Sequence, residues 1–206
     1  MLNLATMPNP LQFHFDFSSP YGYLGSEKIE ALAARHGRGV DWRPMLLGVA
    51  FKATGSQPLT SIPIKGDYTK RDLPRSARFH GVALNMPAKF PIATQAPAGI
   101  VLWQRACDPG GVGTLVKTLY RAYFVAGRDI GDPDTAADVA ATAGVDRNAA
   151  RAVVDDPAWK DALRSEVEAA IAKGVFGSPF VFVDGEPFWG IDRFDQIGRW
   201  LANGRF

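Results

Sequence analysis

One short stretch decides how this chain folds: Phe15-Asp16-Phe17-Ser18-Ser19-Pro20-Tyr21-Gly22-Tyr23. Up to Phe17, apolar and polar residues alternate from Leu11, which predicts a strand. Ser19 is then a good N-cap and Pro20 a good first helical residue, so a helix should follow directly. A strand that runs straight into a helix begun by proline is the local architecture of a redox turn with two cysteines, yet this chain has no Cys-x-x-Cys pair.

The four positions of that turn are Ser19-Pro20-Tyr21-Gly22. Serine keeps a hydroxyl at the helix N-terminus, and glycine at the last position removes any resolving thiol. A helix N-terminus favours an anion and lowers the pKa of a thiol below its usual value of roughly 8.5. The turn therefore suits a thiolate supplied by a ligand such as glutathione, with Ser19 polarising the sulfur and Ser18 as the weaker candidate. The alternative interpretation is that Ser19 only caps the helix.

Composition narrows the class of protein. Of the 206 residues 47% are hydrophobic, enough for a packed core, and the 23 basic and 21 acidic residues nearly cancel, so we expect no nucleic-acid partner. The single cysteine, Cys107, excludes an internal disulfide, fits a reducing compartment and is expected to be buried in a helix. No run of eighteen apolar residues occurs, Met1–Pro10 does not resemble a signal peptide, and the three histidines lack metal-ligand spacing. We therefore expect a cytoplasmic protein with no membrane contact and no metal.

The elements expected at the two ends of the chain make one α/β unit. After the first strand come a helix that stops at Gly37 and a strand at Val40–Pro44, parallel to the first through a right-handed crossover. The end of the chain supplies, in order, a helix through Leu163 and Ile171, the strand Phe180–Val183, the turn Asp184-Gly185, the strand Pro187–Trp189 and a closing helix from Phe194.

The middle of the chain, from about Leu47 to Asp156, has little strand pattern and indicates an all-helical insertion. Lys65–His80 is compatible with a helix, although Pro74 should kink or divide it. The segment 96–128 is split by a turn at 108–111, and Asp-Pro pairs at 132–133 and 156–157 mark further helix starts. The predicted fold class is α/β: a thioredoxin fold, residues 10–46 and 157–206, interrupted by a helical insertion domain, residues 47–156.

A second candidate motif is Gly177-Ser178-Pro179-Phe180. A proline at the mouth of a strand in this fold is expected to be cis and to expose the preceding backbone to a peptide-like ligand; the alternative is an ordinary trans proline. Asp192 could cap the last helix or pair with an α-ammonium group. Lys65 offers a cation for a carboxylate, or is a solvated surface group.

Four stretches give the chain a specific resemblance: FDFSSPYGYLGSEKI, FKATGSQPL followed by IPIKGDY, KFPIATQAPAG, and VFGSPFVFVDGEPFWGIDRFDQI. They extend from Phe15 to Ile197 in one order. Together they resemble the 2-hydroxychromene-2-carboxylate isomerases, relatives of the kappa-class glutathione transferases within the DsbA-like thioredoxin superfamily. The resemblance implies a thioredoxin domain with a helical insertion, glutathione as the cofactor, and a homodimer.

The resemblance also implies roles for particular residues. Ser19 would activate the glutathione thiol, and Lys65 would contact the glycyl carboxylate. Ser178, before Pro179, would bind the cysteinyl backbone through its main chain. Asp192 would hold the γ-glutamyl end.

Three positions depart from the family pattern. Ser56, the remaining residue of the predicted glutathione site, stands where asparagine is frequent in a Gly-Asn-x-Pro motif. Ile191 replaces a serine that precedes the aspartate in kappa transferases, and Gly22 replaces a frequent serine.

Three functions remain open. The first is a glutathione-dependent isomerase of aromatic 2-oxo or hemiketal acids, which in the resembled family interconverts 2-hydroxychromene-2-carboxylate and trans-o-hydroxybenzylidenepyruvate. The second is a kappa-type glutathione transferase or peroxidase, which would consume glutathione. The third is a DsbA-like protein that binds peptides or thiols without turnover. The first needs a small aromatic substrate, for which Phe51, Phe90 and Trp103 are candidate pocket residues.

Overall fold

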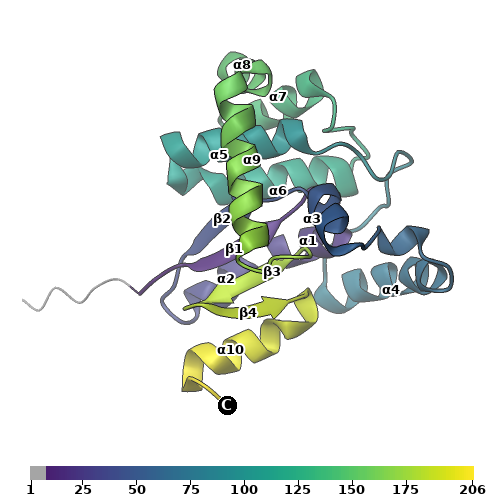
Figure 1. Ribbon diagram of the computed structural model, residues 1–206, viewed down its shortest axis with the longest axis vertical. Coiled ribbons are helices and arrows are strands. Elements are labelled where there is room, and N and C mark those ends of the chain that lie inside the picture. Colours follow the sequence, from purple (N-terminus) through teal and green to yellow (C-terminus); the bar gives the residue numbers. More distant parts are fainter. Residues whose placement is uncertain (1–7) are drawn as a thin grey trace, which may run out of the picture.

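The computed structural model describes residues 8–206, which form a four-stranded sheet covered by helices (Figure 1). The strands lie in the order β2-β1-β3-β4. β1 pairs in parallel with β2 and antiparallel with β3, and β3 pairs antiparallel with β4. Their bounds are β1, Leu11–Phe15; β2, Val40–Pro44; β3, Phe180–Val183; and β4, Glu186–Trp189. The parallel pair and the hairpin confirm the predicted α/β unit.

The first strand is shorter than the sequence predicts. It ends at Phe15 rather than Phe17, because the carbonyl of Asp16 turns back to accept the amide N–H of Ser19 at 2.9 Å. The chain then enters α1, Pro20–Ser26, almost at once. This turn puts Asp16 and Ser19 together at one end of the sheet.

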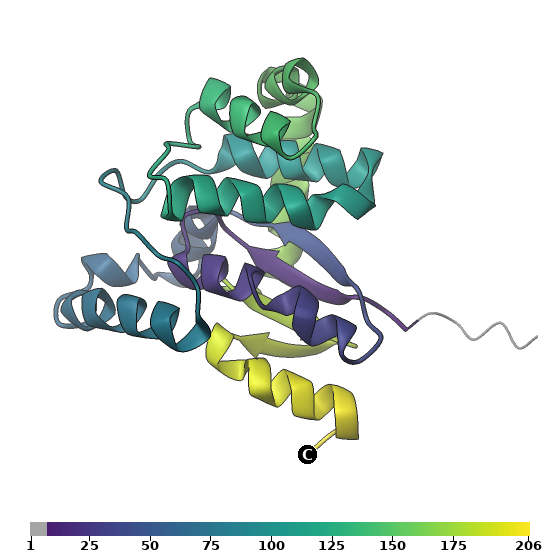
Figure 2. The same ribbon diagram turned by 180° about the vertical axis from the view of Figure 1, so that it is seen from behind.

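Helices lie on both faces of the sheet. α9 crosses the face seen in Figure 1, and α1, α2 and α10 lie on the face seen in Figure 2. The helix expected to run as far as Gly37 is broken into two, α1 and α2 (Ile29–Ala34), and Gly37 follows in the left-handed region at φ 66°. α10, Phe194–Asn203, begins after a short 3-10 turn at Ile191–Arg193.

Between β2 and β3, every regular element of the described chain is helical. In order these are α3, Leu47–Thr54; η1, Leu59–Ser61; α4, Lys65–His80; α5, Gln95–Cys107; η2, Pro109–Gly111; α6, Val112–Phe124; α7, Pro133–Thr142; α8, Arg147–Asp155; and α9, Pro157–Ala172. The two Asp-Pro helix starts are confirmed, because the side chains of Asp132 and Asp156 accept backbone N–H groups in the first turns of α7 and α9. The fold is therefore a thioredoxin-like sheet with a helical insertion. Between residues 8 and 206, no helix is both long and apolar enough to cross a bilayer.

Two local expectations are corrected. Of the two effects expected of Pro74, a division of the helix is wrong, since α4 is a single helix with the proline inside it and with Leu73 and Ala77 on its buried face. Cys107 is exposed rather than buried, because it is the last residue of α5, where the chain leaves the core for the exposed turn that follows.

Aromatic rings from β1, the turn after it, α1 and α6 pack together at the end of the sheet where the turn lies. The ring centroid of Tyr120 is 4.8 Å from that of Phe17, 5.9 Å from that of Phe15 and 5.7 Å from that of Tyr23. All four side chains are at most 2% exposed. Burying a side chain of this size stabilises the fold by roughly 1.5–3 kcal/mol. The cluster therefore fixes α1 against α6 of the insertion.

Candidate functional site

The start of α1 presents the hydroxyl of Ser19 as a fixed donor. Ser19 is the N-cap, and its Oγ accepts the amide N–H of Gly22 at 3.0 Å. The same hydroxyl donates to the carbonyl oxygen of Ser178 at 2.8 Å. Pro20 has no N–H, and the N–H of Tyr21 makes no hydrogen bond within residues 8–206. The turn thus offers an anion one hydroxyl and one backbone donor.

The loop before β3 lies directly against this hydroxyl. The peptide bond between Ser178 and Pro179 is cis, as predicted. Ser178 also faces inward, since its Oγ accepts the amide N–H of Asp16 at 3.0 Å. The structure therefore brings Ser19, Ser178 and Pro179, three of the predicted site residues, to one place.

Gly22 occupies the fourth position of the turn for a steric reason. A Cβ at this position would lie 2.5 Å from Oγ of Ser178 and 2.7 Å from the hydroxyl of Tyr120. Carbon and oxygen do not approach that closely, so a serine or cysteine does not fit here unless its neighbours move. The departure from the frequent serine is thus matched by two hydroxyls that fill the space.

Beneath the turn lies a carboxylate that sequence reasoning did not single out. Asp16 is 2% exposed. Its Oδ1 accepts both the N–H and the hydroxyl of Ser18 at 2.7 Å, and its Oδ2 accepts the N–H of Leu47, at the start of α3, at 2.5 Å. Thr94, just before α5, is a further side-chain donor to it. Burial raises the pKa of Asp16, and these hydrogen bonds oppose the rise. The signal in the sequence is an acidic residue between two phenylalanines.

Tyr120 closes this network from α6. Its hydroxyl donates to the carbonyl of Asp16 at 2.8 Å, and its side chain is fully buried. Burial first, and the nearby charge of Asp16 second, hold the pKa of Tyr120 well above its usual value, so it stays a donor. Its place on the apolar face of α6 does not distinguish it in the sequence from a packing residue.

Asp192 lies on the surface beside the Pro179 loop. The strand end before it is joined to that loop, because the N–H of Gly190 donates to the carbonyl of Pro179 at 3.0 Å. The carboxylate of Asp192 lies 3.1 Å from the guanidinium of Arg193. The cap interpretation is wrong, because no side chain caps α10.

Lys65 and Ser56 are not brought against the turn. Both are exposed, Lys65 as the first residue of α4 and Ser56 just beyond α3, and neither contacts Ser19 through any hydrogen bond in the described chain. α4 is nevertheless tied to α1, since the hydroxyl of Tyr21 donates to Asp72 at 2.5 Å. The glutathione roles of these two residues therefore stay predictions.

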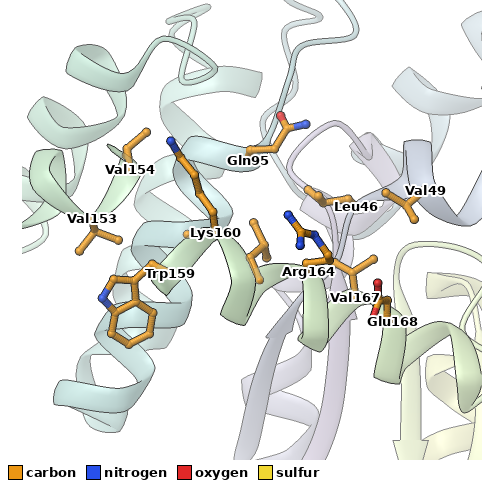
Figure 3. A pocket seen from close by; sticks show the side chains of 12 residues that line it. Leu46, Val49, Gln95, Val153, Val154, Trp159, Lys160, Arg164, Val167 and Glu168 are labelled. Carbon is orange, nitrogen blue, oxygen red and sulfur yellow. The ribbon is translucent and has the colours of Figure 1, made fainter. Parts of the chain in front are cut away.

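A groove of about 270 Å³ lies among α3, α5, α8 and α9. Its walls include Leu46, Val49, Gln95, Trp159, Lys160 and Arg164. Figure 3 shows Lys160 and Arg164 extending to the same side of α9, the side on which Gln95 lies. Leu46 and Gln95 are chain neighbours of Leu47 and Thr94, two of the donors to Asp16, so the groove starts where the buried network ends. None of the three aromatic residues expected to line a substrate pocket borders it.

The fold and this turn define a class. The DSBA-like thioredoxin domain matches residues 10–202, and the chain therefore belongs to that family. It is 32% identical to a 2-hydroxychromene-2-carboxylate isomerase of Sphingobium xenophagum, over 96% of this chain and 100% of that protein. It is 25% identical to glutathione S-transferase kappa 1 of Homo sapiens, over 97% of this chain and 93% of that protein.

A solved structure gives the same relationship in three dimensions. A 2-hydroxychromene-2-carboxylate isomerase superposes with a TM-score of 0.82 at 26% identity, over 93% of this chain and 94% of that chain. The relatives are thus isomerases and glutathione transferases, and the resemblance drawn from the sequence motifs is confirmed.

Proposed function

We propose that this protein is a glutathione-dependent isomerase of aromatic 2-oxo or hemiketal acids, of the type that interconverts 2-hydroxychromene-2-carboxylate and trans-o-hydroxybenzylidenepyruvate. The observation that carries the proposal is the hydroxyl of Ser19, fixed as a donor at the start of α1 in a turn without cysteine. Full-length similarity to a 2-hydroxychromene-2-carboxylate isomerase supports it.

The residues of the turn suit a sulfur anion. When bound, glutathione would supply a thiolate that adds reversibly to an electron-poor carbon, so that a double bond becomes single and can rotate before the thiolate leaves. Ser19 would turn its hydrogen from the carbonyl of Ser178 to the sulfur, and the free N–H of Tyr21 would point to the same anion. A charge-assisted hydrogen bond is worth roughly 1.5–3 kcal/mol.

Other residues would hold the tripeptide. The main chain of Ser178, before Pro179, would pair with the cysteinyl backbone. Asp192 would bind the α-ammonium of the γ-glutamyl end, Lys65 would take the glycyl carboxylate, and Ser56 would add a hydrogen bond.

The direct test is isomerisation of trans-o-hydroxybenzylidenepyruvate with and without glutathione. We expect a rate that rises with glutathione to saturation while the glutathione concentration stays constant. An equal rate without glutathione would contradict the proposal.

A kappa-type transferase or peroxidase is the second candidate, favoured by the full-length similarity to kappa transferases. It differs from the isomerase in the fate of glutathione, because conjugation or peroxide reduction consumes glutathione and isomerisation returns it. A stoichiometric fall in free thiol with a generic electrophile would favour this candidate over the isomerase.

We also propose that the protein is a homodimer. Large apolar side chains are exposed on α4 and the residue before it: Ile64 is 86% exposed, Tyr68 59% and Phe79 83%. The same helix carries the ion pair between Asp72 and Arg75, which a two-fold related copy could exchange with its own. We expect a dimer in sedimentation equilibrium that Ile64→Asp with Phe79→Asp dissociates, whereas Phe206→Asp, at another exposed ring, does not. A monomeric wild type would contradict this proposal.

A cytoplasmic location fits these proposals. Glutathione is abundant in reducing compartments, and Cys107 is a free, exposed cysteine.

A further inference from the structure

Two aromatic side chains lie exposed beside the loop that carries Ser178 and Pro179. Trp189, the last residue of β4, is 53% exposed, and Phe176, which precedes that loop, is 41% exposed. Their rings pack edge to face with centroids 4.8 Å apart. Exposed rings in contact with each other are a common feature of binding surfaces.

The pair is held rigidly. Trp189 stands opposite Phe180 in the β3–β4 ladder, and Phe176 packs on Phe180 with centroids 5.3 Å apart. Phe180 is itself 3% exposed and packs on Phe182. The two exposed rings are therefore backed by a row of packed ones and keep their orientation.

Gly177 lets the indole of Trp189 reach the loop. A Cβ on Gly177 would lie only 2.2 Å from Nε1 of Trp189, so the indole covers the bare backbone of this residue. Gly177 is the neighbour of Ser178, whose carbonyl accepts the hydroxyl of Ser19. The indole therefore covers the residue that lies one step of about 3.8 Å along the chain from Ser178, whose carbonyl contacts the hydroxyl that would hold the sulfur.

The opposite side of Ser19 is closed. Behind its hydroxyl lie Gly22, Tyr120 and Oγ of Ser178, all buried and in mutual contact. A molecule that reacts at the sulfur must then extend over the surface, and the indole is the apolar surface next to Gly177.

We propose that Trp189 and Phe176 form an aryl subsite, which binds the aromatic ring of the molecule that reacts with the thiol. The inference rests on the proposed glutathione function and adds to it the residues that recognise the ring. Offset or edge-to-face contact with an indole favours an aromatic ring over an alkyl group of similar reach, by roughly two- to tenfold in affinity.

The test compares two stable conjugates, S-benzylglutathione and S-methylglutathione, by calorimetry. They share the tripeptide and differ only in the ring. For the wild type we expect the benzyl conjugate to bind about three- to tenfold more tightly. In Trp189→Leu the two affinities should become equal, while glutathione itself binds as in the wild type.

Matched variants separate the subsite from general damage. Trp159→Leu removes a tryptophan from the groove among α3, α5, α8 and α9 and should keep the wild-type ratio. Trp189→Phe keeps an aromatic ring and should retain most of the preference for the benzyl conjugate. Phe176→Leu should lose part of this preference. If Trp189→Leu or Phe176→Leu fails to fold, the other tests the same ratio.

The outcomes differ for the two proposals. A wild-type preference for the benzyl conjugate that survives in Trp189→Leu overturns the aryl subsite alone, as does the lack of any preference in the wild type. Failure of glutathione and both conjugates to bind overturns the proposed function and the subsite together.

Discussion

β1 and the turn after it carry two buried ionisable side chains, His14 and Asp16, and their surroundings in the fold are opposite in kind. Each is 2% exposed. The carboxylate of Asp16 receives donors from its own turn, from the start of α3 and from Thr94. Neither ring nitrogen of His14 has a hydrogen-bond partner among residues 8–206, and its ring packs edge to face on Phe182, with centroids 5.7 Å apart. Asp16 thus belongs to a polar network, whereas His14, two positions earlier in the chain, lies in an apolar core.

The electrostatics follow the same division. Burial first and the charge of Arg43 second lower the pKa of His14 to about 4, while Glu166 opposes them. At Asp16 burial raises the pKa, but hydrogen bonds counteract it. Burial disfavours the charge at both positions, and only the end of the strand provides partners for it.

Removing Asp16 tests the side chain whose hydrogen bonds are satisfied, and it should have the largest effect on stability. Asp16→Ala leaves the buried N–H groups of Ser18 and Leu47 without an acceptor, at roughly 1–3 kcal/mol each. We expect a loss of about 3–5 kcal/mol in the free energy of unfolding, measured with urea. The matched control is Asp132→Ala, an exposed N-cap, expected to cost about 1 kcal/mol. An equal loss in both variants would mean that the network has no special weight.

The pH dependence of stability tests His14, the side chain without hydrogen-bond partners. The folded state resists protonation of His14 down to about pH 4, whereas an unfolded histidine takes up its proton near pH 6.5. The contribution of neutral His14 to stability is therefore present above pH 6.5 and lost as the pH falls, by about 3 kcal/mol at pH 4.

His14→Phe isolates this effect, because Asp16 titrates in both proteins and cancels in the difference. Relative to the wild type, the variant should gain about 3 kcal/mol between pH 7 and pH 4 in chemical unfolding. Parallel stability curves would show that His14 finds a partner or a proton in the folded state.

Ser19→Ala tests whether the network serves catalysis as well as folding. Losing one charge-assisted hydrogen bond to the thiolate, about 1.5–3 kcal/mol, should lower glutathione-dependent activity about ten- to a few-hundredfold near neutral pH. Part of the activity should return at higher pH, where glutathione ionises unaided.

The folded state of Ser19→Ala must be checked first, since losing the cap costs on the order of 1 kcal/mol. Ser19→Cys is the contrasting variant, and with oxidised glutathione it should form a mixed disulfide by thiol–disulfide exchange, which releases one molecule of reduced glutathione. Full activity of Ser19→Ala would reduce Ser19 to a helix cap and move the assigned site.

Ser18→Ala should have the smallest effect. It removes the hydroxyl bond to Asp16 but leaves the backbone N–H bond in place. We expect the free energy of unfolding to fall by about 1 kcal/mol. The activity should stay within about threefold of the wild-type value. A loss of activity as large as that of Ser19→Ala would make Ser18 the better candidate for the thiol.

The sequence alone predicts the local elements of this structure. Ser19 and Pro20 start α1 as their chemistry requires, and the strands and the helix starts at Asp132 and Asp156 follow from alternation and capping. Pro179 could be assigned to the site because it opens a strand after a helix.

Contacts across long separations were out of reach. Tyr120 lies 104 positions from Asp16, and its role depends on how α6 packs over β1, which no local pattern states. His14 alternates with phenylalanines as a polar residue on an open face would, yet α9 covers that face of the sheet. Cys107 was misjudged because helical pattern does not tell where a helix ends.

The hydroxyl hydrogen of Ser19 has consequences for which form of a thiol ligand the turn selects. It is engaged by the carbonyl of Ser178, so an incoming group receives it only by being a better acceptor than an amide oxygen. A neutral thiol is a poor acceptor and would leave that bond intact, whereas an ionised sulfur would win the exchange. The turn would then sense the protonation state of its ligand, and pH would govern which form of the thiol is held as well as how fast it reacts.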